Sequence, residues 1–225
     1  MKVLDLTHTV SGRTMVYPGT EPAELTPANT LERDGFRETR LRLYSHTGTH
    51  MDAPAHMLPD APYLDELDAA QFCGKGYVLD CAPLGAGGRV TAEMLRAVPE
   101  LRTVDFLLLH TGWDAFWGTP DYFGAFPVPT VEAAQALAEL GLKGVAVDAM
   151  SVDPMDSTEF PVHHVLFEHG ILSIENLCNL SEVCGQTVWF AALPLKFQQS
   201  DGAPVRAICI TYKSTCPDLW PGQVL

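Results

Sequence analysis

Three histidines and one aspartate lie within eleven residues of each other and could together bind a metal ion. They are His46, His50, Asp52 and His56. Imidazoles combined with a carboxylate suit zinc, manganese or iron, whereas a calcium site is built from oxygen ligands. Ordinary polar residues at the end of a strand are the alternative, but four potential ligands around one glycine favour a metal site. A site made of His46, His50 and Asp52 needs at least one further ligand.

The spacing of these side chains also predicts how the chain must run. Gly48 and Pro54 oppose a helix, and the even spacings place all four side chains on one face of a strand. A straight strand would separate His46 from Asp52 by about 20 Å, at about 3.3 Å per residue. Donor atoms around one ion lie only about 3 Å apart. We therefore expect a sharp bend, for which Gly48 can supply a bulge or a positive φ, and a second turn at Pro54.

A second region offers further potential ligands. Glu175 ends the apolar run of residues 171–174, and a carboxylate there is unfavourable without a cation or hydrogen bonds. His163 is expected just before a helical turn that runs from about His164 to His169 and stops at Gly170. Glu168 and His169 are expected on the solvated face of that turn.

Strand patterns dominate the rest of the chain. Residues 40–44 alternate between polar and apolar, and five apolar runs read as buried strands: 76–80, 104–110, 144–148, 188–193 and 207–211. Helices are fewer, one capped by Thr91 and running to Leu95, another capped by Thr130 and running to Leu140. With no linker or repeat, residues 1–225 are predicted to form one mixed α/β domain, mostly strands with a few covering helices.

Composition excludes several classes of partner. The chain has 28 acidic and 14 basic residues and a formal net charge of −14. A domain that binds nucleic acid should carry a basic face, and the same acidity opposes an anionic membrane surface. No apolar run reaches the roughly 18 residues of a membrane span, and no signal peptide is evident. We expect a cytoplasmic protein with a small-molecule substrate and with its six cysteines reduced.

The sequence motifs of several other enzyme classes are absent. It has no GxSxG elbow, no HExxH motif and no phosphate-binding GxxxxGK[ST] loop. The glycine-rich residues 85–90 lack the third glycine of a dinucleotide-binding loop, and a plain turn from strand to helix is expected there.

The chain resembles the cyclase family of metal-dependent hydrolases, which includes bacterial kynurenine formamidases and isatin hydrolases. The family signature HxGTHxDxPxH is matched in full by His46, Gly48, Thr49, His50, Asp52, Pro54 and His56. Shorter similarities follow at residues 16–19, 110–113, 151–153, 161–163, 175–177, 193–196 and 201–207, so the resemblance covers nearly the whole chain.

The resemblance implies a site with two divalent metal ions, zinc in the first place and manganese as the alternative. His46, His50 and Asp52 would hold the first ion, and Asp52 would bridge to the second. His163 would bind the second ion and Glu175 both. His56 would be the acid/base residue. The family also implies a swivelling β/β/α fold and a homodimer or homotetramer.

The expected reaction is hydrolysis of a small aryl or cyclic amide, as in the conversion of N-formylkynurenine to kynurenine and formate. Kynurenine formamidases typically have Trp where this chain has Tyr17, which would either line the substrate pocket or belong to the core. An isatin-type lactam hydrolase therefore stays open, as does a cyclase or dehydratase that acts on a small carbonyl compound with one metal. A binding protein without turnover is a further alternative, but it would have no use for an unligated His56.

Overall fold

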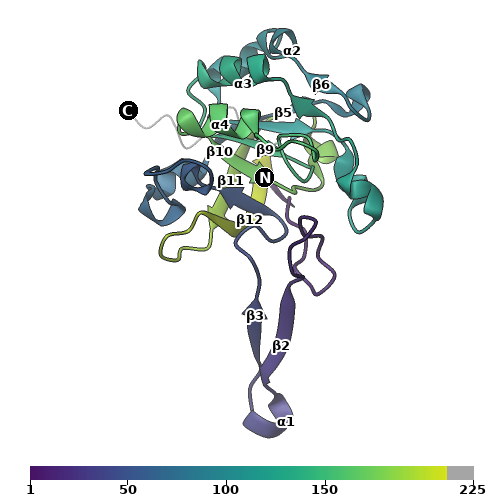
Figure 1. Cartoon of the computed structure of the whole chain (residues 1–225), viewed down its shortest axis with the longest axis vertical. Coiled ribbons are helices and arrows are strands. Elements are labelled where there is room, and N and C mark those ends of the chain that lie inside the picture. Colours follow the sequence, from purple (N-terminus) through teal and green to yellow (C-terminus); the bar gives the residue numbers. More distant parts are fainter. Residues whose placement is uncertain (212–225) are drawn as a thin grey trace.

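A computed structural model describes residues 1–211 of the chain (Figure 1). Seven strands form a closed ring, in the order β12 (Gly202–Thr211), β11 (Thr187–Pro194), β5 (Cys73–Asp80), β7 (Phe106–His110), β9 (Gly144–Val147), β10 (Leu172–Glu175) and β4 (His50–Asp52). Strand β4 pairs back onto β12 and completes the ring. Strand β1 (Lys2–Asp5) pairs with the far end of β12. The neighbours β5, β7, β9 and β10 are parallel, and the other pairings in the ring are antiparallel.

The predicted mixed α/β, strand-dominated architecture is confirmed, with a barrel-like sheet that the sequence analysis did not anticipate. The swivelling β/β/α type stays a prediction, and so does the extent of the domain, since residues 212–225 lie outside the described part. The five buried strands are present, but three begin elsewhere than predicted: β5 at Cys73 and not at residue 76, β7 at Phe106 and not at residue 104, and β12 at Gly202 and not at residue 207. The preceding residues 99–103 form a 3₁₀ turn that starts with Pro99.

Two apolar clusters pack against the two faces of the sheet. One takes side chains from all seven strands of the ring and fills its interior, including Val78, Phe106 and Ile174. The other packs between the sheet and the helices and contains Leu107 and Leu109 of the same strand β7. Because successive residues of a strand face opposite sides, a continuous apolar run such as residues 106–109 serves both clusters at once.

Three helices cover the outer face of the barrel (Figure 1). Thr91 caps α2 (Ala92–Arg96) and Thr130 caps α3 (Val131–Ala138), as predicted. Helix α4 (Pro161–Glu168) begins earlier than expected, so His163 lies inside the helix and the prediction that it precedes the turn was wrong. Pro161 supplies the preset φ of a first helical position, and Asp153 accepts hydrogen bonds from the backbone N–H groups of Val162 and His163.

Short elements complete the description. Strands β6 (Arg89–Val90) and β8 (Val128–Pro129) form a small parallel pair, and η1 (Pro54–His56) is a 3₁₀ turn. Other 3₁₀ turns span Leu64–Glu66, Ala69–Phe72, Ala82–Leu84, Trp113–Phe116, Pro120–Phe123 and Leu180–Val183. No helix within residues 1–211 is both long and apolar enough to cross a membrane. Five cysteines are unpaired, three of them buried, and Cys216 lies outside the described residues.

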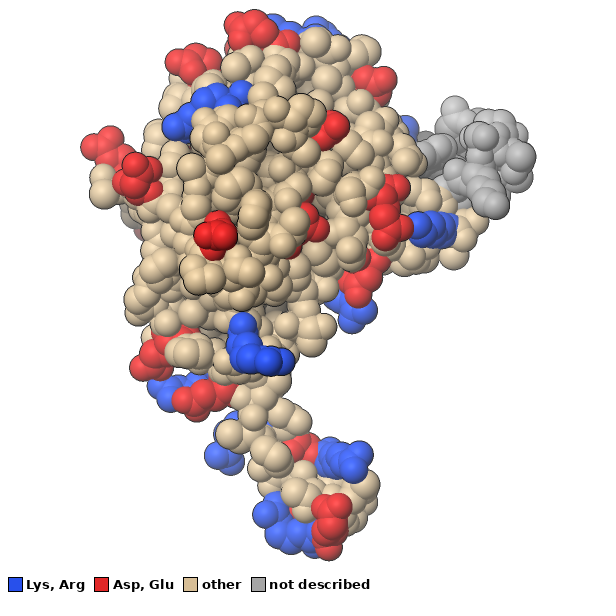
Figure 2. Space-filling model, turned by 90° about the vertical axis from the view of Figure 1, so that its right-hand side faces the viewer, with Lys and Arg blue, Asp and Glu red and all other residues tan. Residues whose placement is uncertain are grey.

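A long hairpin projects from the barrel. Strands β2 (Glu24–Asn29) and β3 (Glu38–Arg42) pair antiparallel, with the short helix α1 (Leu31–Asp34) at their tip. Figure 2 shows this hairpin at the lower end of the molecule, with basic and acidic side chains interspersed. The predicted strand over residues 40–44 corresponds to β3, the second strand of this hairpin, which begins at Glu38 and ends at Arg42. Every residue of β3 is exposed, so its alternating pattern does not mark a face buried in this chain.

Close packing around Gly144 gives a first prediction. A Cβ built on this residue lies 2.9 Å from both Ile174 Cδ1 and Phe106 Cε1. We expect Gly144→Ala to lower the free energy of unfolding by about 1–3 kcal/mol, because the extra methyl overpacks the barrel interior. Urea denaturation measures the change. In the control Gly12→Ala the nearest atom is 3.7 Å away, so stability should stay nearly unchanged. Equal effects in the two variants would contradict the packing argument.

Candidate metal centre

The bend predicted at Gly48 is present. Gly48 has a φ of +70°, strand β4 includes only His50–Asp52, and Pro54 begins the turn η1. As a result His46 folds back onto the strand, and its Nδ1 lies 2.6 Å from Asp52 Oδ1. The Nε2 of His50 approaches the same oxygen to 3.2 Å. The first three predicted ligands are therefore brought together.

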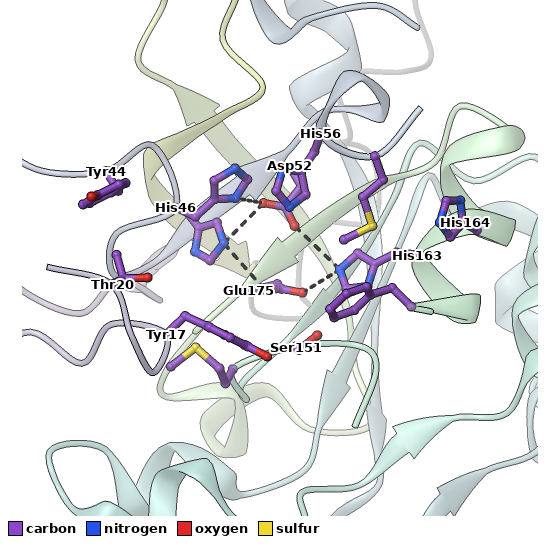
Figure 3. Close-up of a pocket in the computed structure, with 14 residues that line it drawn as sticks. Tyr17, Thr20, Tyr44, His46, Asp52, His56, Ser151, His163, His164 and Glu175 are labelled. Carbon is purple, nitrogen blue, oxygen red and sulfur yellow. Dashed lines mark hydrogen bonds and ion pairs between the residues drawn. The ribbon is translucent and has the colours of Figure 1, made fainter. Parts of the chain in front are cut away.

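Pairing between β4 and β10 adds Glu175, which stands opposite His50 in the register. Its Oε2 lies 3.5 Å from His50 Nε2, and its Oε1 lies 3.1 Å from Nε2 of His163 on α4. The same His163 nitrogen is 3.8 Å from Asp52 Oδ2 (Figure 3). All five predicted ligands thus converge in two groups of donors, His46, His50 and Asp52 in one and Asp52, His163 and Glu175 in the other. Within each group the donor atoms lie within 4.8 Å of one another.

The second ring nitrogen of each of the three histidines has its own partner. His163 Nδ1 lies 2.7 Å from Asp153 Oδ2, and His50 Nδ1 lies 2.8 Å from the Gly48 carbonyl oxygen. His46 Nε2 lies 3.0 Å from Asp201 Oδ2. Ligand histidines of metalloproteins usually donate their other N–H to a carboxylate or carbonyl in this way.

Sequence reasoning missed Asp153 and Asp201 as partners of the histidines. Both fall in segments that share the family resemblance, residues 151–153 and 201–207, which was the only available signal. Nothing in their spacing points to His163 or His46, because helix α4 and the pairing of β12 with β4 set those contacts.

The pKa shifts of these residues show that positive charge stabilises the donor set. Burial disfavours a charged His46, but the carboxylates of Asp52 and Asp201 outweigh it and raise its pKa to about 10. Burial likewise opposes a charged His163, yet Asp153, Asp52 and Glu175 raise its pKa well above the ordinary value. Burial also opposes ionisation of Asp52, but His46 and His50 hold its pKa well below the usual range. Ligand imidazoles bind metals in the neutral form, so a divalent cation could replace these protons. The residues therefore fit a metal ion.

A cavity of about 560 Å³ opens onto the donor groups. His56 lines it and lies beside the first group, with its ring centroid 4.0 Å from that of His46 and its Nδ1 3.6 Å from Asp201 Oδ2. Burial lowers the pKa of His56. Tyr17 is 43% exposed and lines the cavity, so it does not belong to the core. Lining residues that sequence reasoning missed include Thr20, Tyr44, Met57, Met150, Ser151, Phe160 and His164.

Comparison with known proteins identifies the family. Residues 4–154 match the family described as "Putative cyclase". The chain belongs to the cyclase family. The kynurenine formamidase of Bacillus cereus is 31% identical over 206 residues, which cover 91% of this chain and 95% of that protein. The kynurenine formamidase of Salinibacter ruber is 34% identical and covers 92% and 97%. Isatin hydrolase A of Labrenzia aggregata, solved with benzyl benzoate, superposes with a TM-score of 0.83 at 25% identity and covers 94% of each chain.

Close approach of His46 to the backbone of β12 gives a second prediction. A Cβ on Gly202 would collide with the His46 imidazole ring. We expect Gly202→Ala to push this ring away from Asp52 and to weaken binding of zinc by about 10–100-fold, as when a group that orients a ligand is lost. Zinc titration of the metal-free protein measures the affinity, and circular dichroism checks the fold. Gly12→Ala is the control. A folded Gly202→Ala protein with unchanged affinity would show that the close contact with Gly202 does not position His46 for the ion.

Proposed function

We propose that this protein is a metal-dependent hydrolase that cleaves the amide bond of a small aryl or cyclic amide. The observation that carries the proposal is the pair of donor groups that share Asp52 and face a cavity beside His56. The reaction proposed is that of an arylformamidase, N-formylkynurenine to kynurenine and formate. Two kynurenine formamidases that match more than nine-tenths of the chain support it.

Two divalent ions per chain, zinc with manganese as the alternative, are proposed as cofactors. His46, His50 and Asp52 would hold the first ion, and Asp52, His163 and Glu175 the second. The two oxygens of Asp52 support a bridging role, because Oδ1 faces His46 and His50 whereas Oδ2 faces His163. When bound, such ions supply a nucleophilic water at neutral pH and polarise the amide carbonyl.

His56 is proposed as the acid/base residue. It comes from the turn after β4 and lies next to the first donor group, with Asp201 within reach of its Nδ1. In this position it can deliver a proton to the leaving nitrogen of the amide. A group that changes protonation near neutral pH suits this task.

The cavity wall favours a substrate with an aromatic ring. Tyr17, Met150 and Phe160 line it together with the polar donor groups, so a flat aryl ring can pack against them while the amide faces the donors. An isatin-type lactam hydrolase is the second candidate, supported by the superposition with isatin hydrolase A. The same residues would serve, since a lactam is an amide closed into a ring.

We also propose a homodimer or homotetramer. The hairpin of β2 and β3 and its tip expose Leu25, Leu31, Phe36 and Leu41. Large apolar side chains gathered on one projecting segment are typical of a contact surface. A cytoplasmic location is proposed on the unpaired state of the five described cysteines.

The substrate proposal leads to a third prediction. Purified protein loaded with zinc should hydrolyse N-formylkynurenine or isatin, and a chelator should abolish the activity until zinc is restored. Absorbance of the released kynurenine or isatinate follows the reaction. If a broad panel of aryl formamides and lactams stays intact while elemental analysis finds both ions bound, the hydrolase assignment fails.

The role of His56 leads to a fourth prediction. We expect His56→Ala to keep its metal content while turnover falls about 10²–10⁴-fold, the usual contribution of a general acid/base. Elemental analysis and initial rates are measured on the same preparation. His169→Ala, which removes an exposed imidazole from the end of α4, is the control and should leave both unchanged. Loss of metal together with activity would make His56 a ligand, and full activity would remove it from the mechanism.

A further inference from the structure

A second group of ligand-type side chains lies outside the cavity. It consists of Asp80, His110 and Cys184, whose donor atoms lie within 4.8 Å of one another. None of the three lines the cavity at the metal centre. The group combines oxygen, nitrogen and sulfur donors, whereas the metal centre has only nitrogen and oxygen.

Three separate parts of the chain build this group. Asp80 and His110 are the last residues of the parallel strands β5 and β7 and stand opposite each other in the register. Cys184 precedes β11, and two backbone hydrogen bonds hold its segment beside β5, from Gly185 N to the Val78 oxygen and from Val78 N to the Gln186 oxygen. The sheet thus places Asp80 and His110, whereas Cys184 lies in a turn that these two hydrogen bonds attach to β5.

A hydrogen bond to Asp148 orients the imidazole of His110. This carboxylate is fully buried and lies 3.0 Å from His110 Nδ1. It also accepts hydrogen bonds from the backbone N–H groups of Thr111 and Gly112, which fix its own position. Since Nδ1 is taken by Asp148, Nε2 is the nitrogen that remains for an ion. A carboxylate behind an imidazole is the arrangement that orients ligand histidines in metal sites.

We propose that Asp80, His110 and Cys184 form a second metal site that binds a thiophilic divalent cation such as zinc. Thiolate, imidazole and carboxylate are the three ligand types that zinc accepts, and three protein ligands leave one position for water. Binding would release the thiol proton of Cys184 to solvent as the sulfur–metal bond forms. The ion would tie the ends of β5 and β7 to the segment before β11, which is a structural role separate from the proposed hydrolysis.

A reactive cysteine is the competing explanation of the same group. A catalytic thiol needs a positive surrounding that favours thiolate. His110 is the one imidazole in the group, but Asp80 interacts directly with Cys184 and Asp148 adds further negative charge nearby. Like charges oppose a bare thiolate, whereas a bound cation would offset them. The surroundings therefore favour a metal ligand over a nucleophile.

Cobalt(II) is a probe that separates this site from the metal centre. A thiolate bound to cobalt gives a charge-transfer band in the near ultraviolet, and the donors of the metal centre include no sulfur. The full-length protein is stripped with a chelator, reloaded with cobalt and passed through a desalting column. We expect the band in the wild type, its loss in Cys184→Ser, and at least tenfold weaker cobalt binding in His110→Gln. Cys73→Ser is the matched control, because Cys73 is also half-buried and lies outside the group.

The outcomes decide the proposal without reference to activity. A band retained after desalting in the wild type and in Cys73→Ser, but absent from Cys184→Ser, supports it. Absence of the band, its persistence in Cys184→Ser, or its disappearance on the desalting column would overturn it. Should His110→Gln fail to fold, Asp80→Asn replaces it, because Asp80 is exposed and its Oδ1 contact with the Ala82 N–H can be kept by Asn. Hydrolysis measured on Cys184→Ser should be unchanged, so failure here leaves the proposed function intact.

Discussion

The seven-stranded ring closes through β4, a strand of only three residues, and the metal centre depends on that closure. Met51 in the middle of β4 points into the barrel interior, so His50 and Asp52 on either side must face outward. The two antiparallel neighbours of β4 then determine which residues lie beside His50 and Asp52. On one side β10 places Glu175 opposite His50, and on the other β12 places Gly202 opposite Asp52. A shift of one residue in either pairing would turn the donors into the apolar core.

Closure of the ring also explains why glycines lie next to the metal-ligand side chains. His46 can fold back over β12 only because Gly202 has no side chain, and it can turn back only because Gly48 adopts a positive φ. The remaining polar residues of interest follow the ends of the parallel strands. His110, Asp148 and Ser151 come at or just after the carboxyl ends of β7 and β9, the end of the parallel strands at which α/β barrels commonly place their functional residues.

Prediction from sequence succeeded where the determinants are local. The grouping of His46, His50 and Asp52 follows from their spacing and from one glycine, and the capping threonines of α2 and α3 act on their own helices. Prediction failed where contacts between segments far apart in the sequence determine the structure. The apolar pattern of β12 does not reveal that its first residues pair with β4, about 150 positions earlier in the chain, so the ring and Asp201 could not be foreseen. The strand predicted over residues 40–44 is present as β3, but its alternation is the same whether the apolar side faces a core or another surface, so the projecting hairpin could not be foreseen.

Three buried aspartates hold histidines in this fold, and the number of backbone donors around each one separates their roles. Asp148 accepts N–H groups from Thr111 and Gly112, and Asp153 accepts those of Val162 and His163. Backbone N–H groups, joined at Asp148 by the Thr111 hydroxyl, satisfy these two carboxylates as anions, so they can orient an imidazole without further charge. Asp52 is as deeply buried, but among the described residues its hydrogen bonds and ion pairs come only from imidazoles. A buried carboxylate with no backbone donor requires positive charge beside it. Protonated histidines can supply that charge, but a metal ion would do so while it leaves the same imidazoles neutral as ligands, and this requirement distinguishes Asp52 from the two carboxylates that only orient.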